Sequence, residues 1–164
     1  MSDLSNGSAP PPPGEVRRMA VINTQYVKDL SFESPRSPHS LVQQETAAPE
    51  VQVKVDVKAQ NLGQDVYEVT MMVRAEAKYA EDTVFLIELA YGAVVSLLNT
   101  APEDVAPALM IETPRILFPF VRHILATITR DGGFAPLLLG SIDFADMYRQ
   151  RGTSQQPVTG TVAV

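Results

Sequence analysis

This chain of 164 residues contains only two histidines and no cysteine, so the side chains most often used for nucleophilic catalysis and zinc binding are scarce. The two histidines are His39, which follows Pro38 in a proline-containing segment, and His123, within a long apolar stretch. Neither lies near a nucleophile or at a metal-ligand spacing. We interpret both as structural, and we expect no catalytic residue, no metal site and no cofactor.

Carboxylates are the other candidates, and Asp29 and Glu33 form the clearest pair. Four residues along one face of a strand span ~13 Å. The two carboxylates of a glycosidase lie only ~5–9.5 Å apart, so this pair does not fit that chemistry. The residues alone leave two alternatives open: solubility charge on a sheet surface, or an acidic docking surface.

The charge and apolar pattern exclude several classes of partner. The formal net charge is −6, whereas nucleic acids and anionic membranes call for a basic patch. The longest apolar stretch, residues 84–98, contains Glu88 and is shorter than the ~20 residues of a spanning helix. The N-terminus lacks the apolar segment of a signal peptide, and there is no cysteine. We expect a soluble cytoplasmic protein without nucleic-acid binding or direct membrane insertion.

Period-two alternation predicts antiparallel strands that position these groups. We expect strands at residues 26–33, 51–59, 66–79 and 83–91. In the first, strict alternation places Tyr26, Lys28, Leu30 and Phe32 on one face and Val27, Asp29, Ser31 and Glu33 on the other.

The fourth strand is apolar on both faces, which one covered face does not require. Leu86 and Ala90 lie on either side of Glu88, opposite the apolar row that begins at Phe85. The pattern indicates either a second covering layer or an exposed binding patch at Leu86. Residues 34–50 have no pattern of their own, and loops of that length are usually functional or disordered.

Helices are predicted after the sheet. A short helical piece is expected at residues 102–110, and a long helix follows in which Thr113 is the cap and Pro114 the first residue. Pro119 lies inside this helix and predicts a kink or a restarted first turn. A second helix is expected at residues 143–150.

The long helix is apolar over too wide an angle for one interface. Its large apolar side chains sweep roughly 200°, whereas a helix on one sheet needs about 100°. We expect burial on two sides, with a partner subunit as the second layer. The residues expected at this oligomer interface are Phe118, Phe120, Val121, Ile124, Leu125 and Ile128.

Four ordered motifs resemble the SecB family of bacterial export chaperones. They are YVKDLSFE at residues 26–33 followed by Pro35 and Pro38-His39, VYEV at 66–69, ILFPFVR at 116–122 and GFAPL at 133–137. The resemblance implies an α+β fold with a four-stranded antiparallel sheet and two C-terminal helices. It also implies a homotetramer, assembled as a dimer of dimers with the long helix sandwiched between sheets.

The function implied by the resemblance is ATP-independent holding of unfolded preproteins and their delivery to the SecA motor. The family's SecA contact falls on Asp29, Glu33, Leu86 and Glu88. Its client groove falls on Leu41, Val51, Val53, Val55, Phe144, Met147 and Tyr148. The implied chaperone domain is residues 19–151, between disordered tails at 1–18 and 152–164.

Two other classes remain open on the residues alone. A small α+β enzyme would use Glu88 or Asp143 as a base in an apolar pocket with a raised carboxylate pKa. A structural subunit of a constitutive complex would co-purify with one fixed partner.

Overall fold

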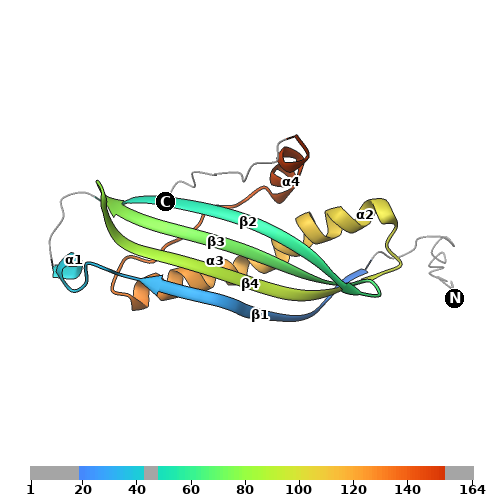
Figure 1. Cartoon of the computed structure of the whole chain (residues 1–164), viewed down its shortest axis with the longest axis horizontal. Coiled ribbons are helices and arrows are strands. Elements are labelled where there is room, and N and C mark those ends of the chain that lie inside the picture. The colour runs from blue at the N-terminus through green and yellow to red at the C-terminus, as the bar shows by residue number, and fades with distance from the viewer. Residues whose placement is uncertain (1–18, 43–47, 154–164) are drawn as a thin grey trace, which may run out of the picture.

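A four-stranded antiparallel sheet is the frame of the protein in the computed structural model, which describes residues 19–42 and 48–153. The strands are β1 (Met19–Glu33), β2 (Glu50–Gly63), β3 (Val66–Tyr79) and β4 (Asp82–Leu98). Their order across the sheet is β1-β4-β3-β2, which leaves β1 and β2 at the edges (Figure 1). The predicted α+β class and the antiparallel sheet are confirmed. Of the predicted tails at 1–18 and 152–164, residues 1–18 and 154–164 lie outside the described residues. Gly152 and Thr153 instead belong to the last helix, which extends farther than predicted.

The connections follow from this strand order. Tight turns join β2 to β3 and β3 to β4, with positive φ at Gln64, Asp65 and Ala80, as short hairpin turns require. The link from β1 to β2 must instead cross to the opposite edge of the sheet. It contains the short helix α1 (His39–Val42) and five residues, 43–47, that are not described.

Helices cover one face of the sheet and leave the other face open. Helix α2 (Pro102–Pro107), one π-helical turn at Ala108–Glu112 and α3 (Thr113–Asp131) follow each other without a break. In Figure 1 the strands lie in front of α3. Fully buried side chains of α3 pack into the core formed by the inner face of the sheet; they include Leu117, Val121 and Leu125.

Thr113 does not act as the predicted helix cap, because the helical backbone already runs through Glu112. Its hydroxyl donates instead to the Ala108 carbonyl at 2.8 Å. Pro114 has no N–H to donate, and the wide π-helical turn lies immediately before it. Pro119 lies inside α3 without ending the helix. The irregular turn of this helical segment is instead at residues 108–112.

A bulge in β1 corrects the predicted alternation of that strand. The pairing with β4 shifts between Val27 and Asp29, so Lys28 is an extra residue. One inserted residue reverses which face the preceding side chains occupy. Tyr26 therefore lies on the open face with Glu68, while Phe32 packs inward against Phe85 and Phe134.

The last helix, α4 (Phe144–Thr153), is fixed at the β2 edge. Asp143 caps it by accepting the Asp146 N–H at 2.9 Å, which lowers the pKa of Asp143. Phe144 is buried in edge-to-face contact with Phe118, with ring centroids 5.8 Å apart. Near the other end, Arg151 pairs with Asp56 and donates to the Val57 carbonyl at 2.6 Å.

We predict that Gly132→Ala destabilises the fold. A Cβ at Gly132 would lie 2.4 Å from Cζ of Phe32, a ring held by the aromatic cluster with Phe85 and Phe134. Overpacking of this kind costs about 1–3 kcal/mol of unfolding free energy, measurable by urea denaturation. Gly152→Ala is the control, since no heavy atom lies within 4 Å of its added Cβ. Equal stability of the two variants would contradict this packing.

Candidate functional site

An apolar groove lies where the segment that connects β1 to β2 meets the end of α3. Its volume is ≈ 690 Å³. It is lined by Ser40, Leu41, Ala48, Pro49, Val51, Tyr79, Val84, Phe85 and residues 133–137. The wall is largely aliphatic and aromatic, so the groove can bind apolar side chains.

The wall formed by residues 133–137 is held in place by Thr129. This buried side chain donates to the Leu125 carbonyl at 2.8 Å and accepts the Leu137 N–H at 2.9 Å. The chain leaves α3 through Gly133, whose φ of 89° favours glycine. On the opposite wall, Leu41 lies against Gly133. The groove thus has one wall fixed to α3 and another formed by the segment that crosses between the sheet edges.

The structure brings together only some of the predicted client-binding residues. Leu41 and Val51 line the groove. Val53 and Phe144 are instead buried in the core, and Met147 packs against it. Tyr148 is half-buried, and Val55 lines a different hollow, described below.

Sequence reasoning missed the aromatic part of the groove. Phe85 and Phe134 come from β4 and from the turn after α3, with ring centroids 5.2 Å apart. Phe134 belongs to the motif at 133–137 on which the family resemblance rests. That motif was the one signal that could have indicated a role for Phe134. Nothing in the local pattern indicated that Phe85 would meet it.

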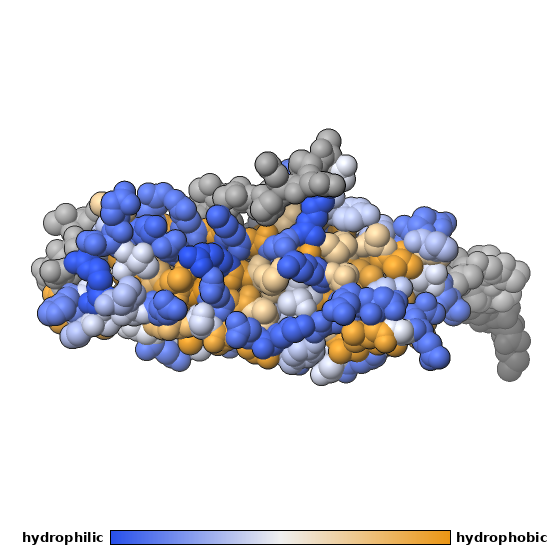
Figure 2. All heavy atoms as spheres, viewed as in Figure 1, coloured by the Kyte–Doolittle hydropathy of each residue, from blue (hydrophilic) through white to orange (hydrophobic). Residues whose placement is uncertain are grey.

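The second candidate is the acidic strip, defined as Asp29, Glu33, Leu86 and Glu88. Strand pairing places Glu33 opposite Leu86, Ser31 opposite Glu88 and Asp29 opposite Ala90. Because directly paired residues share a face, all four members of the strip lie on the open face of the sheet. Figure 2 shows this face, where hydrophilic residues lie among apolar surface.

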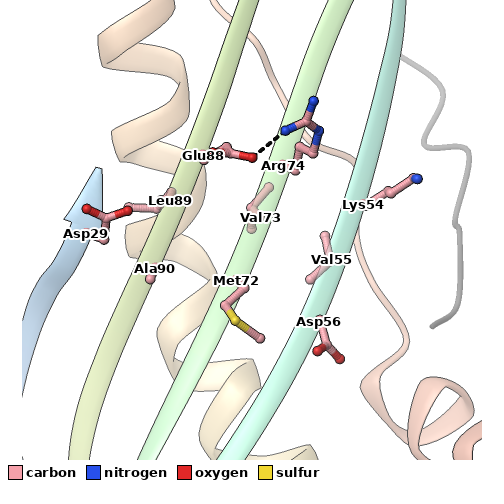
Figure 3. Close-up of a pocket in the computed structure, with 10 residues that line it drawn as sticks. All are labelled: Asp29, Lys54, Val55, Asp56, Met72, Val73, Arg74, Glu88, Leu89 and Ala90. Atoms are coloured by element: carbon pink, nitrogen blue, oxygen red, sulfur yellow. Dashed lines mark hydrogen bonds and ion pairs between the residues drawn. The ribbon is translucent and has the colours of Figure 1, made fainter. Parts of the chain in front are cut away.

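The carboxylates of the strip differ in their partners. Glu88 forms an ion pair with Arg74 of β3, drawn in Figure 3. Within the described residues, no ion pair involves Asp29 or Glu33. Leu86 is half-buried between charged neighbours.

A hollow of ≈ 390 Å³ lies beside the acidic strip (Figure 3). Asp29 and Glu88 border it from β1 and β4, and Met72 and Ala90 contribute apolar surface. Lys54 and Asp56 border it from β2. An adjoining hollow of ≈ 270 Å³ shares Asp29, Met72 and Ala90 with the first and reaches Lys58.

Farther along the open face, Glu68 is the centre of a charged cluster. It accepts hydrogen bonds from Lys28, at 2.8 Å, and from the Tyr26 hydroxyl. The hydrogen bond from Lys28, followed by that from Tyr26, lowers the pKa of Glu68. The same bond to Glu68 raises the pKa of Tyr26, because the carboxylate disfavours the phenolate.

The predicted oligomer residues on α3 divide into two sets. Phe118, Val121 and Leu125 are buried within this chain's own core, so in this conformation they cannot contact another subunit. Phe120 is 47% exposed and stacks on Tyr91, with ring centroids 6.2 Å apart. Ile124 and Ile128 are half-buried. One turn before Phe120, Ile116 is also 47% exposed, so α3 keeps an exposed apolar surface.

The two carboxylates considered as enzymatic bases have other environments. Glu88 is exposed and paired with Arg74, and Asp143 is an exposed helix cap. Neither carboxylate is buried, although Glu88 borders the open hollow described above. No group of three or more potential metal ligands occurs in the described part of the chain. Among its helices, none is long and apolar enough to cross a membrane.

Comparison with known proteins gives a consistent result. Residues 14–155 match the family model described as SecB, preprotein translocase subunit SecB. A protein-export protein SecB from Nitrobacter hamburgensis is 43% identical over 155 residues, covering 94% of this chain and 97% of the relative. One from Paramagnetospirillum magneticum is 43% identical over 148 residues, covering 90% and 95%.

A solved structure is similar in fold. It is a SecB-like chaperone from Mycobacterium tuberculosis in complex with a peptide from an antitoxin. The TM-score is 0.57 at 15% sequence identity, and the match covers 75% of this chain and 90% of that one.

Proposed function

Because the chain belongs to the SecB family of protein-export chaperones, we propose that it holds unfolded preproteins and delivers them to the SecA motor. The observation that carries this proposal is the pairing of an apolar groove with a separate acidic strip on one small domain. Holding is ATP-independent and takes place in the cytoplasm. The chaperone domain is residues 19–151.

The groove supports client binding through its chemistry. An unfolded chain offers scattered aromatic and aliphatic groups, which a wide apolar surface can accept without a fixed sequence. The peptide in the M. tuberculosis complex is a precedent for client binding on a related fold.

The acidic strip supports docking as a cluster. Single exposed ion pairs contribute only ~0.2–1 kcal/mol, so affinity must come from several charges around an apolar contact. Leu86 is that contact, since it lies directly opposite Glu33 and two residues before Glu88 on the same strand. A basic and apolar segment of SecA is the complementary partner.

Assembly as a dimer of dimers is supported by two unpaired surfaces. β1 is an edge strand of 15 residues, and no other described strand pairs with its outer side. Such edges pair readily with another strand. The apolar surface of α3 around Ile116 and Phe120 provides a second interface. We propose β1 pairing within a dimer and helix packing between dimers.

For client holding, we predict that Leu41→Asp weakens suppression of aggregation of an unfolded preprotein several-fold. The change places a charge in the apolar groove. Val42→Asp is the matched control, because Val42 is 74% exposed and does not line the groove. Light scattering of a refolding client measures both. A parent-like result for Leu41→Asp would place client binding elsewhere.

For docking, we predict that Glu33→Lys with Glu88→Lys weakens SecA binding at least tenfold, most at low salt. Calorimetry measures the affinity, and client holding should survive. Glu81→Lys with Glu103→Lys changes the net charge equally at exposed positions outside the strip and should retain binding. Unchanged affinity of the first variant would remove the strip from the docking site.

For assembly, we predict a tetramer at micromolar concentration, and smaller species for Phe120→Asp. Burial of such a side chain contributes ~1.5–3 kcal/mol, which a buried carboxylate would reverse. Light scattering gives the mass. Leu62→Asp, near the end of β2, is 54% exposed and serves as the control. A monomeric parent protein would contradict the proposed assembly.

A further inference from the structure

Around the two hollows, the uncompensated charges of the open face are separated by sign. On β1 the carboxylates Asp29 and Glu33 are exposed, and on β2 Lys54 and Lys58 are exposed. No ion pair of these four side chains occurs within the described residues. The acidic edge and the basic edge, as we call these two pairs, are three strand spacings apart, which is ~14 Å.

The charges between the two edges are compensated. Glu88 pairs with Arg74, and Glu68 pairs with Lys28. On β2 itself Asp56 lies between the two lysines, but it is paired with Arg151 of α4. The other carboxylate of β2, Glu50, lies at the strand start opposite Lys78 and borders neither hollow.

Apolar surface joins the two edges. Met72 and Ala90 pair directly across β3 and β4, and Asp29 pairs with Ala90 on the other side. The two hollows described above share Met72 and Ala90, with Asp29 as their acidic border. Lys54 borders one and Lys58 the other. Acidic residues on β1, apolar residues on β4 and β3, and basic residues on β2 therefore follow one another across the sheet.

We propose that this face binds a polarised segment of the docking partner, laid across the strands, with its cationic end over β1 and its anionic end over β2. An apolar side chain of the segment occupies the surface at Met72 and Ala90. The inference rests on the proposed docking of SecA and adds a second anchor of opposite sign. Because the reversed orientation would place like charges together, the two edges fix the direction of the bound segment.

The test is Lys54→Glu with Lys58→Glu in the full chain, with SecA binding measured by calorimetry at low and physiological salt. Each replacement changes the charge by two units, so the net charge moves from −6 to −10. A partner that is attracted only by the negative charge of this protein would bind the variant more tightly, because the variant is more negative. A polarised segment would bind about threefold to tenfold more weakly, since two favourable contacts become repulsive.

The neutral variant Lys54→Gln with Lys58→Gln should give a smaller loss in the same direction. It also excludes an artefact in which a glutamate at 54 pairs with Arg74, which lies directly opposite. Both lysines are exposed, so thermal unfolding should match the parent. Unchanged or tighter binding of SecA by the Glu variant would overturn the proposal.

The acidic-strip variant, measured in parallel, separates this proposal from the one it rests on. If Glu33→Lys with Glu88→Lys loses binding while the lysine variants do not, docking survives and the polarised segment is rejected. If neither variant affects SecA, the docking site itself is rejected. A changed assembly mass for the lysine variants would assign this face to a second copy of the chain, and weaker client holding would assign it to clients. Either result overturns the proposal.

Discussion

The sheet has a helical layer on only one side, and the other properties of the molecule depend on this constraint. Successive side chains of a strand point to opposite faces, so every strand must provide a core residue and a surface residue in turn. On β4 the buried row contains Ile87 and Leu89, while Leu86, Glu88 and Ala90 face outward. One strand therefore stabilises the fold and forms much of the proposed docking face, and the two roles do not compete for the same side chains.

The same constraint separates the proposed client groove from the docking face. The groove lies on the helical side, where Phe85 and Phe134 meet at the end of α3. The acidic strip lies on the opposite side, where charge is exposed to water. The two surfaces thus lie on opposite sides of the sheet, which suits a protein that must hold one molecule while it contacts a second.

The sequence predicted the regular parts of this architecture because they leave a local signature. Period-two alternation marked all four strands, and the wide apolar sweep of the long helix indicated more than one interface. The bulge at Lys28 escaped detection, because one inserted residue leaves the flanking pattern intact while reversing the face of Tyr26. Helix α4 was predicted from its apolar row. That row indicated that the side chains are buried, but it did not indicate which surface they pack against. Phe144 consequently lies against Phe118 and not in the groove. The acidic strip was expected from the family resemblance, and it consists of two short sequence pairs on β1 and β4. The groove joins residues from several separate segments, which no local pattern connects.

The contact of α4 with β2 has a consequence for self-association. A protein that holds unfolded chains is surrounded by extended backbones, and an open sheet edge is a template on which they can polymerise. Arg151 donates to the Val57 carbonyl, in the middle of the edge strand β2, and its guanidinium also holds Asp56. Desolvation there lowers the pKa of Arg151, yet an arginine remains charged. A carbonyl already engaged in this way is a poor starting point for strand addition, and the helix shields its surroundings. The C-terminal helix thus protects the chaperone from the aggregation that it is proposed to prevent in others.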